Sequence, residues 1–165
     1  MRWARYGAVV FAVCVLMALV FASRLSAGAP VSSGWEREYD MRVAEEWQKD
    51  VPVEDDSVVG GRVYVWQPYH LLLAIAPREL SVVLPVLFVI FSVLIVGSLA
   101  DVMVRSVKEW WLVMAVLVGS PSVVWLGVGG GALSFAVLLV LGAVWCGRRR
   151  WWKAAAMLAF VAPWV

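Results

Sequence analysis

The sequence predicts an all-α polytopic membrane protein: a bundle of four to five transmembrane helices with an outer loop that bears interfacial amphipathic helices. Of the 165 residues, 63% are hydrophobic and only 16% are charged, whereas a typical soluble domain is about half apolar and about a quarter charged. This composition excludes a soluble globular enzyme and a disordered chain. The net charge of +2, without a basic cluster on a soluble element, excludes a nucleic-acid-binding protein.

Apolar runs divide the chain, which we treat as one membrane domain over 1–165. The expected spans lie at about 6–22, 80–100, 110–128, 132–147 and 154–165. Crossing the hydrocarbon core takes roughly 20 apolar residues, so the last run is too short to span unaided. The third run contains Gly119-Ser120-Pro121, where we expect a kink or a break, because proline interrupts the helical hydrogen bonds.

The first run resembles a signal peptide, because Arg2 and Arg5 precede it and small residues follow it. Its best Ala-x-Ala-like site, at 27–29, is followed by Pro30, which is unfavourable for cleavage. We therefore expect an uncleaved signal anchor. The two cysteines, Cys14 and Cys146, lie in apolar runs without CxxC spacing and are interpreted as small apolar residues.

Basic residues predict the orientation. They precede the first run, separate the second from the third, and separate the fourth from the fifth: Arg2, Arg5, Arg105, Lys108, Arg148, Arg149, Arg150 and Lys153. With five alternating spans all of them share one side, which the positive-inside rule makes cytoplasmic. We expect a multi-pass plasma-membrane protein with a cytoplasmic amino terminus and an extracytoplasmic loop at 23–79. Because the runs lack ionisable residues, a proton-coupled transporter or a charged channel is disfavoured.

The outer loop at 23–79 holds ten of the twelve acidic residues. Ser33 and Glu36 have the spacing of a capping box, which predicts a helix start. A stripe of apolar and aromatic residues then recurs every fourth position: Trp35, Tyr39, Val43 and Trp47. With charged residues around it, this stripe predicts an amphipathic helix over 33–50 that lies in the membrane interface.

An acidic turn follows at Glu54, Asp55 and Asp56. One interpretation is an exposed, solvated loop. The other is a divalent cation site, because hard cations prefer clustered oxygen ligands. Beyond it, residues 62–66 are expected to be extended. The segment 68–76 is apolar but too short to span, and it predicts a short interfacial or re-entrant helix before the second span.

Two segments of the outer loop carry a family resemblance. Residues 38–47 read EYDMRVAEEW, and residues 64–74 read YVWQPYHLLLA. They look like the D-x-R-x-x-x-x-A/W and Y-x-Y-P-P-x-Y-H-x-L-L-A segments of GT-C membrane glycosyltransferases, the polyprenyl-phosphate-sugar-dependent enzymes that include mannosyltransferases and arabinosyltransferase-like proteins. Ser120-Pro121, the glycines at 129–131 and the arginines at 148–150 resemble the later pattern of a kink, a turn and a basic loop.

The resemblance implies transfer of a hexose or pentose from a polyprenyl-phosphate donor at the outer face. An acidic residue near the start of the first outer loop is typically catalytic in this family, which makes Asp40 the candidate general base. The leaving phosphate needs cationic or hydrogen-bond stabilisation. The candidate substrate-binding residues are Arg37, Arg42, Arg62, Tyr64, Gln67 and His70. No cofactor is implied beyond the cation considered for the acidic turn.

The resemblance covers most of the chain but only part of such an enzyme, so we expect a truncated or incomplete module. The alternative is a small non-enzymatic multi-pass protein that acts as a subunit or an assembly partner. Expected partners are membrane lipids, a lipid-linked sugar donor and a protein that completes the helix bundle, since Gly119 and the glycines at 129–131 permit close helix approach. A holin-like pore former fits the small size but not the long outer loop.

Overall fold

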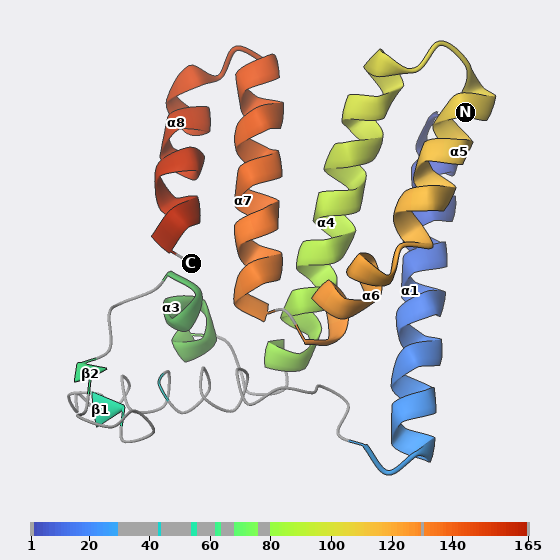
Figure 1. Cartoon of the computed structure of the whole chain (residues 1–165). Helices are drawn as coiled ribbons and strands as arrows, with labels where there is room; N and C mark the ends of the chain where they lie inside the picture. Colours follow the sequence, from blue (N-terminus) through green and yellow to red (C-terminus); the bar gives the residue numbers. More distant parts are fainter. Residues whose placement is uncertain are drawn as a thin grey trace.

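The computed structural model of the chain describes residues 2–29, 43, 54–55, 62–63, 68–75, 80–129 and 131–164. Within these ranges the chain consists of helices joined by short turns and connections, with one pair of two-residue antiparallel strands (Figure 1). The helices are α1 (Arg2–Ser26), α3 (Pro68–Ile75), α4 (Leu80–Met103), α5 (Val107–Val118), α6 (Pro121–Val128), α7 (Gly131–Arg148), α8 (Trp152–Val161) and the 3₁₀ helix η1 (Ala162–Trp164). The strands are β1 (Glu54–Asp55) and β2 (Arg62–Val63).

Three helices of the described part are long and apolar enough to cross a membrane. They are Trp3–Ser26, Val83–Met103 and Gly131–Arg148. The pair α5 and α6 is bent by 51° and adds a fourth span if it counts as one broken crossing. These apolar helices are consistent with a multi-pass membrane protein, as the composition indicates. The fifth expected run forms α8, which has ten residues and is too short to span.

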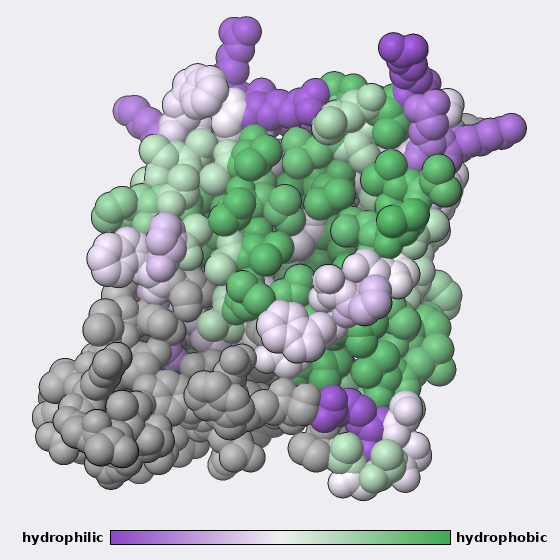
Figure 2. Space-filling view, in the orientation of Figure 1, coloured by the Kyte–Doolittle hydropathy of each residue, from purple (hydrophilic) through white to green (hydrophobic). Residues whose placement is uncertain are grey.

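The central helix of the bundle is α4. It packs against α1, α5, α6 and α7, and α7 in turn carries α8 and η1. Figure 1 shows α7 and α8 on one side of α4, with α1 and α5 on the other. The N-terminus, the α4–α5 connection and the α7–α8 connection lie at one end of the bundle, and α3 lies at the opposite end. Figure 2 shows an apolar band between these two ends, with charged side chains gathered at the end that holds the connections.

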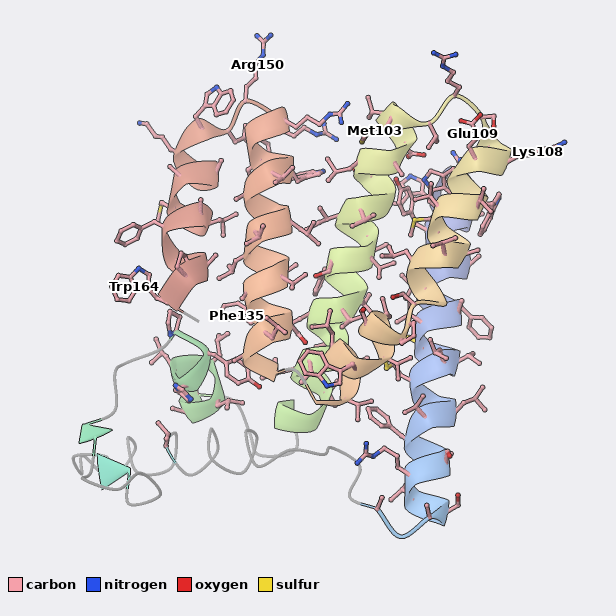
Figure 3. The ribbon with its side chains drawn as sticks, viewed as in Figure 1. Met103, Lys108, Glu109, Phe135, Arg150 and Trp164 are labelled. Carbon is pink, nitrogen blue, oxygen red and sulfur yellow. The ribbon has the colours of Figure 1, made fainter. Side chains whose placement is uncertain are left out.

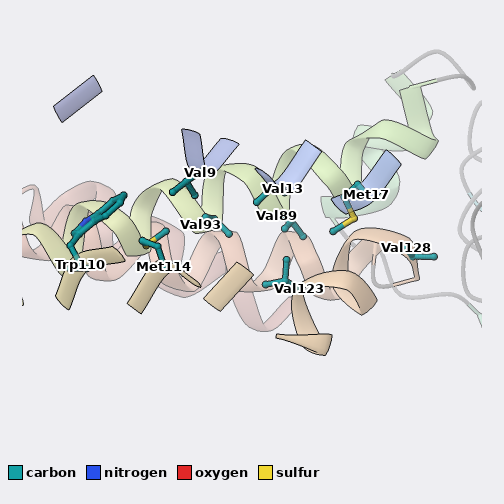
Figure 4. Packing of buried hydrophobic residues seen from close by; sticks show 10 residues of the cluster. Val9, Val13, Met17, Val89, Val93, Trp110, Met114, Val123 and Val128 are labelled. Carbon is teal, nitrogen blue, oxygen red and sulfur yellow. The ribbon is translucent and has the colours of Figure 1, made fainter. Parts of the chain in front are cut away.

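The main core joins α1, α4, α5 and α6. Val9, Val13 and Met17 recur every fourth residue, so they share one face of α1, and each is at most 4% exposed. That face packs on a cluster from the other helices (Figure 4): Val89, Val93, Ala100, Trp110, Met114, Val123 and Val128. The remaining faces expose large apolar side chains, such as Phe11 on α1 (69% exposed) and Val116 on α5 (68% exposed). Apolar residues on the outside are what a lipid-facing surface requires.

The chain breaks between α5 and α6, where the sequence predicts a kink. Gly119 caps the end of α5, and its N–H donates to the Ala115 carbonyl oxygen at 2.9 Å. Ser120 then adopts an extended backbone, and its hydroxyl oxygen accepts from the Ser122 N–H at 3.3 Å. Pro121 occupies the first turn of α6, where its missing N–H costs no helical hydrogen bond. The three residues therefore end one helix, cap the next and set the 51° bend.

Candidate functional site

Most of the candidate residues of the outer loop lie outside the part of the chain that the structure describes. Arg37, Asp40, Arg42, Tyr64 and Gln67 lie outside the described residues. Their proposed roles therefore stay predictions from the sequence. Within the expected helix 33–50, the structure describes one member of the aromatic-apolar stripe, Val43, which is helical and fully buried. The amphipathic helix expected over 33–50 otherwise lies outside the described residues and stays a prediction.

The acidic turn is described at two positions by its backbone. Glu54 and Asp55 form β1, and Arg62 and Val63 form β2, with Glu54 opposite Val63 and Asp55 opposite Arg62. Asp56 lies outside the described residues. Arg62, a candidate phosphate ligand, is thus paired through its backbone with the acidic segment. In the described residues no group of three or more His, Cys, Asp or Glu side chains is arranged to hold a metal ion.

His70 is the one candidate whose side chain the structure describes. It lies in α3 and is 1% exposed, and its ring centroid is 6.2 Å from that of Tyr69. Tyr69 and Leu73 of the same helix are 2% and 4% exposed. The part of the second GT-C-like segment that the structure describes, from Pro68 onward, is therefore helical and packed into the bundle. A ligand that contacts the His70 imidazole must reach a buried group.

An aromatic cluster holds α3 against the ends of α4 and α7. The Tyr69 ring lies 6.4 Å from Phe88 of α4 and 6.3 Å from Phe135 of α7, and the last two rings are 5.0 Å apart. Figure 3 labels Phe135 at the α3 end of α7. Tyr69 also passes over the first residue of α7, because a Cβ added at Gly131 would overlap the Tyr69 hydroxyl. This close approach explains why glycine occupies the first position of α7.

The opposite end of the bundle contains a polar cluster that the sequence analysis did not single out. The Tyr6 hydroxyl donates to Asp101 Oδ2 at 2.6 Å, and Arg5 Nη2 lies 3.7 Å from Asp101 Oδ1. The Arg5 guanidinium also lies over the Trp110 ring, 5.1 Å from its centroid. The Trp110 indole N–H donates to the Gly97 carbonyl oxygen at 3.0 Å. These contacts fix the start of α1 to the end of α4 and the start of α5.

Asp101 escaped notice because the charge-free run at 80–100 stops one residue before it. In the sequence it resembles an ordinary charge of the following loop. The structure continues α4 through Asp101 to Met103, so the carboxylate belongs to the helix, and its side chain is 12% exposed. One feature of the sequence points to Asp101: it and Glu109 are the two acidic residues outside 23–79. A charged residue that adjoins a membrane span needs a partner.

Comparison with known proteins assigns no relative: no family model, no curated protein and no solved structure matches the chain.

Proposed function

We propose that the chain is a membrane glycosyltransferase module of the GT-C type that transfers a sugar from a polyprenyl-phosphate donor at the outer face of the plasma membrane. The observation that carries the proposal is the burial of Tyr69 and His70, at 2% and 1% exposure, in a helix docked on α4 and α7. Burial of an imidazole costs free energy unless the group is hydrogen-bonded, so the burial of His70 supports a role for this segment beyond connecting two spans.

The distribution of charge supports an outer location for α3. Lys108 and Arg150 lie at one end of the bundle, and α3 lies at the other (Figure 3). Three more arginines are exposed at this end: Arg105 between α4 and α5, Arg148 at the end of α7, and Arg149 directly after it. The positive-inside rule assigns such an end to the cytoplasm, which leaves α3 and the loop at 23–79 outside. The proposal includes four to five crossings, with the amino terminus inside.

In the proposed reaction Asp40 acts as the general base. It accepts the proton of the acceptor hydroxyl as that oxygen forms a bond to the anomeric carbon. The bond from the anomeric carbon to the donor phosphate oxygen breaks, and the negative charge passes to the polyprenyl phosphate. Arg37, Arg42 and Arg62 are the cationic side chains proposed to stabilise that charge, since charge-assisted hydrogen bonds to phosphate are strong. A positioned general base contributes about 10²–10⁴-fold to the rate.

The remaining candidates bind substrate in the proposal. Tyr64 and Gln67 precede α3 and supply hydrogen bonds to the sugar, and His70 supplies one to the phosphate or to a sugar hydroxyl. Because His70 is buried, its replacement by alanine is expected to lower both the activity and the thermal stability. A variant of Arg37 is expected to lower the activity alone.

The test is sugar transfer by membranes that contain the Asp40→Asn variant. Radiolabelled polyprenyl-phosphate sugars serve as donors, and product formation is measured against the wild type. The matched control is Glu45→Gln, which removes one negative charge from the same predicted helix. We expect Asp40→Asn to lose at least about a hundredfold in rate, with normal amounts of folded protein and with Glu45→Gln unaffected. Equal rates in both variants, or no transfer by the wild type from any such donor, would remove the proposal.

A second candidate function, that of a non-enzymatic subunit or assembly partner, is favoured by α8. This helix buries none of its residues, and it exposes Met157 at 70% and Phe160 at 72%, although ten residues do not cross a membrane. A partner helix beside α8 would complete the bundle. Purification in mild detergent distinguishes the two functions: a stoichiometric complex without transfer activity supports this one, and a monodisperse, active monomer excludes it.

A further inference from the structure

A pocket at the cationic end of the bundle lies between α1, α4 and α7, and has a volume of about 510 Å³. This size is within the range of ordinary small-molecule sites. Its lining comes from all three helices: Trp3 and Tyr6 of α1, Ser98 and Asp101 of α4, and Trp145 and Arg149 at the end of α7, with Leu94 below them. The pocket and α3 lie at opposite ends of the bundle (Figure 1), so binding in the pocket does not depend on sugar transfer.

The pocket is polar at the ends of the helices and apolar deeper in the bundle. Trp3 and Tyr6 lie within the first turns of α1, Asp101 lies two residues before the end of α4, and Arg149 directly follows α7. Leu94 precedes Asp101 by seven residues, which places it about 10 Å further along the helix axis. If these helices cross a membrane, the polar part lies at the level of the lipid headgroups and the Leu94 part reaches into the hydrocarbon. An amphiphilic lipid has the same arrangement, with a polar headgroup above apolar chains.

Two opposite charges face this pocket. Asp101 uses Oδ2 for the hydrogen bond from Tyr6, whereas its Oδ1 is 3.7 Å from Arg5 Nη2, beyond the length of a hydrogen bond. Oδ1 therefore keeps capacity to accept a proton donor. The Arg149 guanidinium lies over the Trp145 ring at 5.2 Å. A guanidinium has five N–H donors, so one held over an aromatic ring can still donate to a phosphate.

The neighbouring indoles complete the site. The Trp145 N–H donates to Ser98 Oγ at 3.2 Å, which fixes the ring between α7 and α4. Trp3 is 88% exposed at the rim. Indole faces attract ammonium groups, and tryptophan prefers the membrane interface. The pocket thus combines an acceptor for an ammonium N–H, a donor for a phosphate, and an apolar floor.

We propose that this pocket binds a phospholipid whose headgroup carries a primary ammonium beside its phosphate, as phosphatidylethanolamine does. The phosphate pairs with Arg149, the ammonium donates to Asp101 Oδ1, and the acyl chains pass Leu94. A quaternary ammonium has no N–H to donate to the carboxylate, so a choline headgroup binds less well. An anionic glycerol headgroup lacks the positive charge that Asp101 selects.

The test is native mass spectrometry of the full-length protein with phosphatidylethanolamine, phosphatidylcholine and phosphatidylglycerol of identical acyl chains. The wild type is expected to retain the ethanolamine lipid about tenfold better than the other two, the factor for one charge-assisted hydrogen bond. Asp101→Asn is expected to abolish this preference, and Arg149→Gln to weaken retention of all three lipids. The matched controls are Glu109→Gln and Arg148→Gln, which change the same charges at exposed positions outside the pocket lining.

Two further measurements test the proposal: lipid retention by a Leu94→Trp variant and competition by a soluble headgroup. Leu94→Trp fills the deep part of the pocket without changing a charge, and it is expected to lower lipid retention in a protein that still unfolds cooperatively on heating. Soluble phosphoethanolamine, titrated against the wild type, is expected not to compete at lipid-saturating concentrations, because it lacks the chains. Equal retention of the three lipids by the wild type would overturn the proposal, as would identical losses in Arg149→Gln and Arg148→Gln, or full competition by phosphoethanolamine.

Discussion

The Tyr6 hydroxyl donates a hydrogen bond of 2.6 Å to Asp101 Oδ2, and this bond joins residues that are 95 positions apart in the chain. It connects the start of α1 to the end of α4, in a partly buried setting where Arg5 lies 3.7 Å from the other carboxylate oxygen. A hydrogen bond to a charged group contributes about 1.5–3 kcal/mol in general. The contact therefore serves as a clamp between the first helix and the centre of the bundle.

The first prediction concerns this clamp. Tyr6→Phe removes the donor and leaves the Asp101 carboxylate with a longer contact to Arg5, so we expect the thermal unfolding temperature in detergent to fall. Asp101→Ala removes both acceptor oxygens, so each single substitution abolishes the hydrogen bond. In a double-mutant cycle the two substitutions should couple by about 1 kcal/mol. Purely additive effects would show that the hydrogen bond adds nothing to the stability of the bundle.

A second prediction compares two adjacent tryptophans of α5. Trp110 is 1% exposed and donates to the Gly97 carbonyl oxygen, whereas Trp111 is 41% exposed. Trp110→Phe leaves a buried cavity and removes the indole hydrogen bond to Gly97, so it should lower the unfolding free energy by about 1–3 kcal/mol. Trp111→Phe is the matched control and should change it by less than about 0.5 kcal/mol. Equal losses would contradict the packing described for α5 on α4.

The third prediction tests how α3 is held. Gly131→Ala places a methyl group against the Tyr69 hydroxyl, and overpacking of this kind costs about 1–3 kcal/mol. Tyr69→Phe in the same chain removes the obstructing oxygen and should restore part of the lost stability. The control is Gly7→Ala, where an added Cβ meets nothing within 4 Å. Thermal unfolding of the four proteins checks the prediction, and no recovery in the double variant would contradict it.

Much of the helical architecture follows from local sequence. Runs without charge form the long helices, because such segments satisfy their backbone internally and favour an apolar surrounding. The break at Ser120-Pro121 is equally local, since a capping hydroxyl and a proline at the first turn act within a few residues. The helices extend beyond the charge-free runs, and α1 begins at Arg2 rather than near Tyr6, because charged residues at a span end remain helical while their heads reach the interface.

The contacts between distant residues were not predictable in the same way. Neither Tyr6 nor Asp101 shows a periodicity that pairs it with the other. The reason for Gly131 is the hydroxyl of Tyr69, which arrives from another segment, although the sequence indicates only a turn there. Of the candidate catalytic site, the described residues establish the position and burial of His70. The assignment of Asp40 depends on a pattern of residue types, and single-sequence patterns do not fix geometry.

The proposed sugar transfer requires α3 on the outer side of the membrane, which puts the Asp101 end on the cytoplasmic side, so the most direct measurement is the sidedness of these two ends. In a cysteine-free background (Cys14→Ala, Cys146→Ala), single cysteines are placed at the exposed positions Ile75 of α3 (Ile75→Cys) and Arg150 after α7 (Arg150→Cys). A membrane-impermeant maleimide is applied to intact cells. We predict labelling of Ile75→Cys in intact cells and of Arg150→Cys only after permeabilisation. The reverse pattern, or labelling of both from one side, would contradict the account.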